Sequence, residues 1–414
     1  MGSLRRFWSP KLAVVLVLAV TAVSCSSDST TDGTESSPTE APVTTAAEST
    51  TTSEAPTEPE PEEADVDEPA VADFAAVTEE VEAFVESRGL EGAGLIVVHE
   101  EGGVLYEEYF GTFTPDRISM IASASKMISA GVLLRLQDDG LLDIDAPVEG
   151  VVDWAVGNPD ITPAQLISNS SGLVGLGPNI LYGPYLCQWG VPNTLQECGE
   201  AVFSSSDDDA DQVPPDSEFR YGGAQWQVAG AVAEAVSGTS WDRLIDEIYV
   251  EPCEVDSLGY ISLGAVPIGP GGYPVGFGGD PSGVTPSANP SVEGGAHITV
   301  SDYGKLLLMH LRGGKCGDDQ VLSQASLDTM HADRISAVYD GDASAPDTGY
   351  GMGWWVDRDT GRISDPGAWG AVPWLDLDDR YGAYLVVEDQ AVTGQALKDQ
   401  IEDLVHEAAV GAQA

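Results

Sequence analysis

The sequence predicts an α/β fold of the α+β type, in which strands from both ends of the chain form one antiparallel sheet and a helical lobe is inserted between them. Strand-like apolar patterns occur at residues 94–110 and again beyond residue 350, whereas residues 123–249 consist mainly of helical patterns and loops. The sheet is therefore expected to combine segments that are distant in the sequence.

Each predicted element rests on its own periodicity and on the turn residues that bound it. Apolar residues at helical spacing predict the first helix, and the turn Glu101-Gly102-Gly103 separates the first two strands. A Gly- and Pro-rich connection at 264–295 divides the helical middle from the C-terminal part. In chain order, the predicted elements are a helix at 77–87, strands at 94–99 and 104–110, helices at 127–136, 163–167, 226–236 and 301–311, strands at 351–356, 374–377 and 382–388, and a helix at 395–408.

The first segment, residues 1–25, has the pattern of an export signal. Three basic residues precede an apolar core at 12–23, which is short for a membrane span and ends in Ala-Val-Ser-Cys25. This ending resembles the bacterial lipobox, so we expect a lipoprotein signal peptide in which Cys25 becomes lipidated. The alternatives are ordinary cleavage near Ala22 or a retained anchor.

The second segment, residues 26–72, is predicted to be a disordered acidic linker rich in Ser, Thr and Pro. Residues 26–70 contain thirteen acidic residues, no lysine or arginine and no aromatic residue. Such a composition buries too little apolar surface to offset the entropy lost on ordering. Residues 73–414 would then form one folded domain, held by the lipid anchor at the outer face of a bacterial cell membrane, or released outside the cell.

The folded domain is strongly acidic. The chain has 17 basic and 68 acidic residues; removing three basic residues in the signal and thirteen acidic ones in the linker leaves 14 and 55, a net charge near −41. Nucleic acid and anionic lipid surfaces both require a basic patch on their partner, so the charge argues against either. The membrane is expected to be reached only through the N-terminal lipid.

Four cysteines follow the signal, and an even number in an exported domain predicts two disulfides. Of the three possible pairings we favour Cys187 with Cys198 and Cys253 with Cys316. Their spacing matches no zinc pattern, and the five histidines are scattered along the chain. The sequence therefore predicts no metal and no other cofactor.

The segment Ser123-Ala-Ser-Lys126 contains the only charge between residues 118 and 134. The apolar residues that follow predict a buried helix, on which positions three apart share a face, so the two side chains should meet. Burial disfavours the charged form of an amine and leaves it able to accept a proton, and a serine hydroxyl becomes nucleophilic when such a base is beside it. The alternative is that this short pattern arises by chance.

A second candidate is Tyr221 in Phe219-Arg-Tyr-Gly-Gly223, which precedes a predicted helix. By itself it is more consistent with a packed aromatic than with a site residue. Together with Ser123 and Lys126, however, this order resembles the serine β-lactamase-related family, which includes class C β-lactamases, D-alanyl-D-alanine carboxypeptidases of the penicillin-binding type, and esterases.

Further segments carry the resemblance, which covers about residues 75–410. They are Asp138-Asp-Gly-Leu-Leu-Asp-Ile-Asp-Ala-Pro-Val, Ile161-Thr-Pro-Ala-Gln-Leu-Ile-Ser-Asn-Ser-Ser-Gly172-Leu, Gly294-Gly-Ala-His-Ile-Thr-Val-Ser-Asp302 and Tyr350-Gly-Met-Gly-Trp. The resemblance implies a β-lactamase/transpeptidase-like fold. It also implies that Ser123 is acylated, that Lys126 transfers its proton, and that Tyr221 helps to protonate the leaving group. Gly223 lacks the side chain that the family's YxN or YxS motif places toward the substrate or the lysine.

The third family motif, KTG or HxG, is similar to Asp365-Pro-Gly367-Ala368 in its glycine spacing. This match implies an oxyanion hole formed by the N–H groups of Ser123 and Ala368, each such donor being worth about 3–4 kcal/mol of barrier. An alternative alignment places Trp369-Gly370-Ala371 at the motif. Asp365 stands where relatives carry a positive charge, so it either faces the pocket and repels anionic substrates or turns outward and begins a turn.

These observations predict that residues 73–414 form a serine hydrolase that acts through an acyl-enzyme on a carboxylic ester or amide, including peptidoglycan as one substrate class. The alternative is a catalytically impaired, penicillin-binding-like domain that binds peptidoglycan or a protein. Gly223 and Asp365 favour the alternative because they depart from the family motifs. Ser123, Lys126 and Tyr221 favour the enzyme, because a binding domain gains nothing from a desolvated lysine.

Overall fold

The computed structural model describes residues 73–411 except 178, 270, 271, 276, 278 and 344. The expected signal peptide at 1–25, its Cys25 and the linker at 26–72 lie outside the described residues. Within the described part, no helix combines the length and the apolar character that crossing a membrane requires.

A seven-stranded antiparallel sheet in the order β2-β1-β12-β11-β10-β9-β8 forms the centre of the folded unit. Strand β1 (Gly92–His99) pairs with β2 (Gly103–Gly111) on one side and with β12 (Tyr381–Val386) on the other. The first and last strands of the sequence are therefore neighbours, and the predicted sheet of N- and C-terminal strands is confirmed. The remaining strands are β11 (Ala371–Asp376), β10 (Ile363–Ser364), β9 (Trp355–Asp357) and β8 (Thr348–Tyr350).

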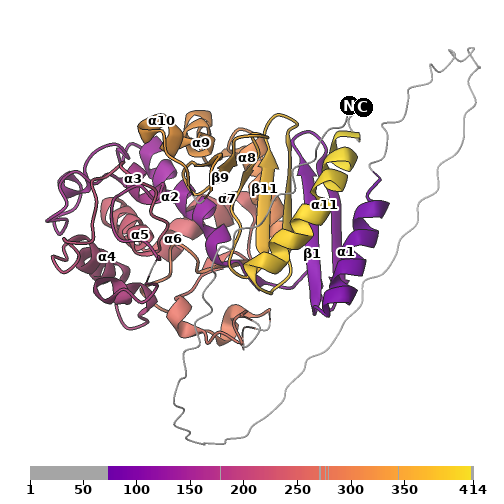
Figure 1. The fold of residues 1–414 in the computed structure, drawn as a ribbon, viewed down its shortest axis with the longest axis horizontal. Helices are drawn as coiled ribbons and strands as arrows, with labels where there is room; N and C mark the ends of the chain where they lie inside the picture. The colour runs from indigo at the N-terminus through magenta and orange to yellow at the C-terminus, as the bar shows by residue number, and fades with distance from the viewer. Residues whose placement is uncertain are drawn as a thin grey trace, which may run out of the picture. The chain divides into compact units, whose positions relative to one another are not determined.

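Strand β1 is buried along its whole length because both faces of the sheet are covered. Successive side chains of a strand point to opposite faces. Leu95 and Val97 accordingly pack in the core beneath α1 (Ala75–Arg88) and α11 (Ala391–Gly411), and the alternate side chains of the strand belong to the larger core on the other face. Figure 1 shows α1 and α11 side by side on their face of the sheet.

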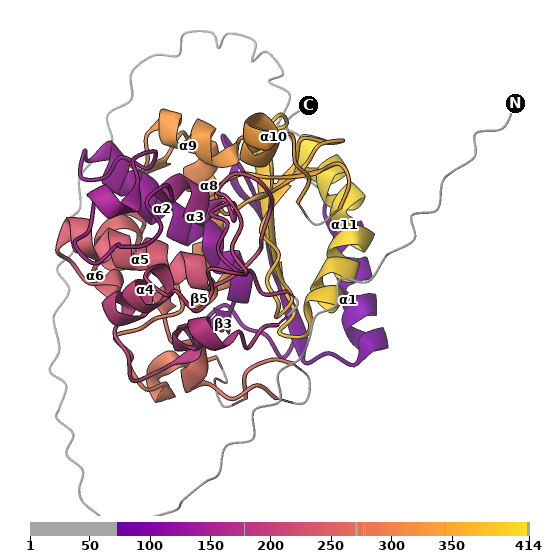
Figure 2. The ribbon, with the colours of Figure 1, turned by 60° about the vertical axis from the view of Figure 1, so that its left-hand side comes forward.

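The predicted helical lobe lies on the other side of the sheet, together with α8 (Val300–Leu311), which packs against β1 and β12 (Figure 2). Helix α2 (Lys126–Asp138) runs through this lobe, and its first nine residues are all buried. The other helices of the lobe are α3 (Pro163–Ile167), α4 (Leu195–Phe203), α5 (Ala224–Ser237) and α6 (Trp241–Ile245).

The prediction of a continuous strand at 351–356 is wrong. Residues 351–354 separate β8 from β9, and Gly353 adopts φ +82°. A Cβ at this position would lie 2.7 Å from the carbonyl oxygen of Lys126. The strand is interrupted because the backbone approaches the start of α2 too closely for any side chain, and only glycine adopts this conformation readily.

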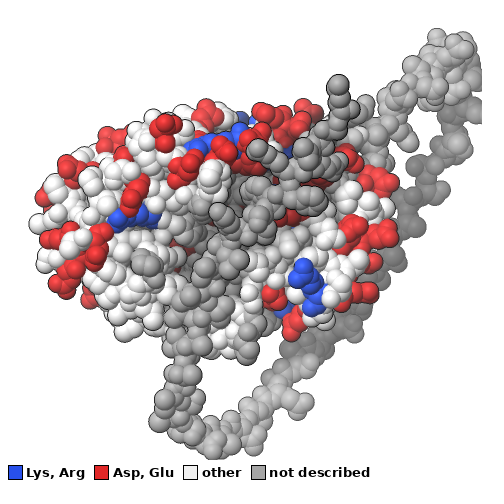
Figure 3. Space-filling view, viewed as in Figure 1, with Lys and Arg blue, Asp and Glu red and all other residues white. Residues whose placement is uncertain are grey.

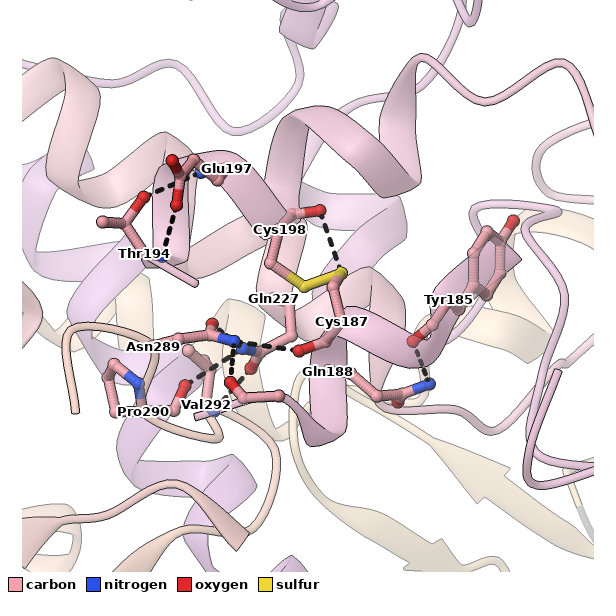
Figure 4. The surroundings of a disulfide bond; sticks show 11 residues. Tyr185, Cys187, Gln188, Thr194, Glu197, Cys198, Gln227, Asn289, Pro290 and Val292 are labelled. Carbon is pink, nitrogen blue, oxygen red and sulfur yellow. Dashed lines mark hydrogen bonds between the residues drawn. A yellow bond between two sulfur atoms is a disulfide. The ribbon is translucent and has the colours of Figure 1, made fainter. Parts of the chain in front are cut away.

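Both predicted disulfides are present. Cys187–Cys198 joins the turn at Gly183–Trp189 to α4, and Cys253–Cys316 joins α7 (Glu251–Cys253) to the short strand β6 (Lys315–Cys316). In Figure 4 the first disulfide lies beside a hydrogen-bond network in which Asn289 Nδ2 donates to the carbonyl oxygen of Cys187 at 2.9 Å. This hydrogen bond connects the disulfide loop to the segment around Asn289.

Candidate active site

Ser123 lies in a single 3-10 turn, Ala122–Ser125, and α2 begins only at Lys126. The expectation that both residues share one α-helical turn is therefore corrected, although side chains three positions apart also align in a 3-10 turn. Ala122 adopts φ +48°, an unusual conformation for alanine. Ser125 holds the turn, because its Oγ donates to the carbonyl oxygen of Ala122 at 2.5 Å and accepts from the N–H of Ala296 at 3.1 Å.

The Lys126 side chain is 1% exposed and points back to the serine. Its Nζ donates to Ser123 Oγ at 3.2 Å and to the carbonyl oxygen of Glu293 at 2.8 Å. The same nitrogen lies 4.7 Å from the ring centroid of Tyr221 and 5.7 Å from that of Trp226. The structure therefore brings together the three residues singled out in the sequence, and it surrounds the amine with aromatic rings that favour a cation over their faces.

Gly223, the residue before α5, leaves no empty space at the position of the missing side chain. A Cβ there would lie 2.5 Å from Gln188 Oε1 and 2.9 Å from Glu293 Oε1. Two side chains that the sequence analysis did not identify therefore occupy this volume. The only available signal was that Glu293 directly precedes the Gly294-Gly295 pair of a family-like segment.

Asp365 neither faces a pocket nor turns outward, so both expectations for its orientation are wrong. It is fully buried, and its Oδ2 accepts a hydrogen bond from the N–H of Met127 at 3.1 Å. The carboxyl group thus lies at the N-terminus of α2, where a helix offers unpaired N–H groups and a positive dipole end. Burial raises the pKa of Asp365 well above its usual range, and the charge of Lys126 opposes this rise.

The loop after Asp365 runs alongside the Ser123 turn. A Cβ on Gly367 would lie 2.0 Å from the carbonyl oxygen of Ile121 and 3.3 Å from the backbone nitrogen of Ala124. The N–H of Gly367 donates to the carbonyl oxygen of Ala371 at 2.7 Å, and Ala368 is exposed in the turn between them. Ala368 is therefore available for an oxyanion role, which stays a prediction. Trp369, the residue of the alternative alignment, is buried against Tyr273.

Tyr221, whose ring lies beside Lys126 Nζ, also lines a cavity of about 750 Å³. Three more aromatic residues, Tyr182, Phe219 and Trp355, line it. Its charged lining residues are Asp211, Glu218 and Arg220, and the Arg220 guanidinium is bonded to Glu218 and to the carbonyl oxygens of Gly172 and Asp211. The cavity therefore offers aromatic surface and acidic groups, with its one arginine already paired.

One cluster among the described residues has the spacing of a metal site, namely Asp376, Asp379 and His406. Asp376 Oδ2 already accepts a hydrogen bond from Arg362 Nε at 2.8 Å. The cluster also lies at the far end of β11 from the loop that approaches Ser123. It therefore plays no part in the chemistry of the candidate active site.

Comparison with known proteins identifies the same relatives as the motifs. The family described as Beta-lactamase matches residues 77–406. The chain is 26% identical over 301 residues to Penicillin-binding protein 4 of Amycolatopsis lactamdurans, which corresponds to 68% of this chain and 75% of that protein. Its fold resembles the octameric penicillin-binding protein homologue from Pyrococcus abyssi, with a TM-score of 0.62, 18% identity and coverage of 80% and 77% of the two chains. It also resembles EstCE1, a hydrolase with promiscuous acyltransferase activity, with a TM-score of 0.64, 19% identity and coverage of 81% and 99%.

Proposed function

Because the chain belongs to the β-lactamase family, we propose that it is a serine hydrolase that cleaves neutral carboxylic esters or amides through an acyl-enzyme. The observation that carries the proposal is the contact between Lys126 Nζ and Ser123 Oγ at 3.2 Å, made by a lysine side chain that is itself buried. A base within hydrogen-bond reach of a hydroxyl is the arrangement that nucleophilic catalysis requires.

The proposed reaction has two stages. Lys126 accepts the hydroxyl proton while Ser123 Oγ attacks the substrate carbonyl, and the N–H groups of Ser123 and Ala368 bind the oxyanion that forms. The proton then passes, with the help of Tyr221, to the leaving alcohol or amine, and an acyl-serine ester is left. A water molecule attacks this ester and the acid is released, while one proton of that water passes to Ser123 Oγ and restores the hydroxyl group.

The substrate preference rests on the charges around the cavity rather than on Asp365, whose carboxyl group is buried. Among the charged residues on the face of the molecule in Figure 3, acidic residues predominate over basic ones. Within the cavity, Asp211 and Glu218 outnumber the single Arg220, which is already paired. An anionic substrate would meet repulsion there, whereas a neutral ester would not. We therefore expect short-chain neutral esters to be hydrolysed and carboxylate-bearing β-lactams to be poor substrates.

A fluorophosphonate probe tests the proposal without knowledge of the natural substrate. The full-length protein should be labelled on Ser123, as located by peptide mapping, and Ser123→Ala should abolish labelling and ester hydrolysis while retaining the wild-type melting temperature. Labelling of a different serine would contradict the mechanism. No labelling of a folded protein would favour a domain that only binds. Efficient cleavage of a cephalosporin would contradict the preference for neutral substrates.

A further inference from the structure

Glu293 presents two different groups to the candidate active site. Its backbone carbonyl oxygen accepts a hydrogen bond from Lys126 Nζ at 2.8 Å. Its carboxyl group is buried beside Gly223, and neither carboxyl oxygen has a hydrogen-bond partner among the described residues. A buried carboxyl group without partners costs free energy, so its presence beside a buried amine calls for a reason other than stability.

The position of Glu293 is fixed by its neighbours in the chain. The N–H of Val292 donates to Gln227 Oε1 at 2.8 Å, and the carbonyl oxygen of Val292 accepts from Ser129 Oγ at 2.6 Å. On the other side, the N–H of Gly295 donates to the carbonyl oxygen of Ser291 at 2.7 Å. Figure 4 shows Gln227 and Val292 within the network that also contains Asn289. The carboxyl group therefore projects from a rigid backbone.

The charged and titratable groups near Lys126 and this carboxyl come from four parts of the fold. Lys126 at the start of α2 is the cation, and its Nζ lies over the ring of Tyr221, which precedes α5. Asp365 accepts a hydrogen bond from the N–H of Met127, the residue after the lysine, and Tyr260 of β4 (Gly259–Tyr260) is buried near the Glu293 carboxyl. Burial raises the pKa of Glu293, and Lys126 opposes this rise. The nearby cation therefore favours the ionised form of the Glu293 carboxyl group.

We propose that Glu293 is a positioning residue for the catalytic base: its carbonyl oxygen holds Lys126 Nζ against Ser123, and the charge of its buried carboxyl group sets the pH range in which Ser123 reacts. This inference rests on the proposed function, in which Lys126 must be a free amine to accept the serine proton. A carboxylate beside an amine favours the ammonium form, which cannot accept the proton of the serine. Without the negative charge, the reaction of Ser123 should extend to lower pH.

The test is the pH dependence of fluorophosphonate labelling at Ser123, measured for the full-length protein and for Glu293→Gln. Glutamine keeps the shape of the side chain and removes its charge. We expect the acid limb of the labelling rate to move to lower pH by about one unit or more. Glu293→Asp, which retains the charge, should keep its acid limb within a fraction of a unit of the wild type. Glu79→Gln, an exposed residue on α1, is the charge-matched control and should change nothing.

An acid limb that is identical in the wild type and Glu293→Gln would overturn the inference, since a space-filling role is preserved by glutamine. A folded Glu293→Gln that is unreactive at every pH would overturn it as well, because a positioning role predicts a shift and not a loss. Either result leaves the proposed function intact provided that wild-type Ser123 is labelled. Failure of the proposed function is recognised separately, by the absence of labelling in the wild type.

Discussion

Two buried carboxyl groups near Lys126 differ in their hydrogen bonding. Asp365 and Glu293 are both buried carboxyls whose pKa values are raised by burial and lowered by the lysine. Asp365, however, accepts a hydrogen bond from the N–H of Met127 at the start of α2, whereas Glu293 has no hydrogen-bond donor for its carboxyl oxygens among the described residues. The difference indicates that Asp365 belongs to the architecture that holds the start of α2, and that Glu293 is free for the role proposed above, in which its charge acts on the lysine.

Removing the amine of Lys126 should have the largest effect. Lys126→Ala is expected to lower the rate of ester hydrolysis at least about 100-fold, because Ser123 loses the base within reach of its proton. Steady-state kinetics on a neutral ester, with circular dichroism to verify folding, measure the effect. A folded variant with nearly full activity would mean that another group deprotonates the serine.

Asp365→Ala should distinguish a structural role of Asp365 from a direct role in the reaction. The substitution leaves the N–H of Met127 without its acceptor in a buried site, so we expect the free energy of unfolding to fall by about 1–3 kcal/mol. Glu293→Gln breaks no described side-chain hydrogen bond, so it should change the free energy of unfolding by less. Urea denaturation of both variants measures the contrast. If Asp365→Ala were as stable as the wild type but inactive, Asp365 would have a direct role in the reaction.

The smallest effect concerns the pH dependence of stability. A carboxyl whose pKa is raised on folding contributes stability at low pH, which is lost as the pH rises from its unfolded value through its folded value. Asp365→Asn does not titrate, so its stability relative to the wild type should increase above about pH 4, by at most about 1.4 kcal/mol per pH unit. Chemical denaturation between pH 4 and pH 8 measures the difference. If the stability of Asp365→Asn relative to the wild type decreased with pH, the positive N-terminus of α2 would outweigh burial and lower the pKa of Asp365.

The sequence predicted the features that depend on local spacing. The helix at 163–167 has the predicted bounds, the two disulfides have the preferred pairing, and Ser123 meets Lys126 because they lie three positions apart. Short-range periodicity and the reach of a side chain were sufficient for the helix and for the Ser123–Lys126 contact. Cys187–Cys198 closes a short loop, whereas Cys253 and Cys316, which are 63 residues apart, are the pair that this choice leaves. Local spacing did not place Tyr221 near the site. That placement came from the family resemblance.

The features that the sequence did not predict depend on contacts between distant segments. Asp365 turns inward because β10 ends beneath α2, and Gly353 interrupts a strand because the same helix start approaches it. Glu293 reaches the lysine because β5 (Ala296–Ile298) pairs with β3 (Ser119–Met120) just before Ser123. No periodicity within one segment reports which other segment will lie against it.

The pairing of β1 with β12 has a consequence for how the molecule assembles. Gly94 is in register with Val386, so the contact that joins the two ends of the sheet spans almost the whole folded unit. Contacts of such long range form late, because their loop closure is entropically costly. Until the C-terminal strands are in place, the edge of the apolar strand β1 that later pairs with β12 is unpaired. An unpaired edge of this kind promotes aggregation. The last strands to be synthesised are therefore the ones that protect the first.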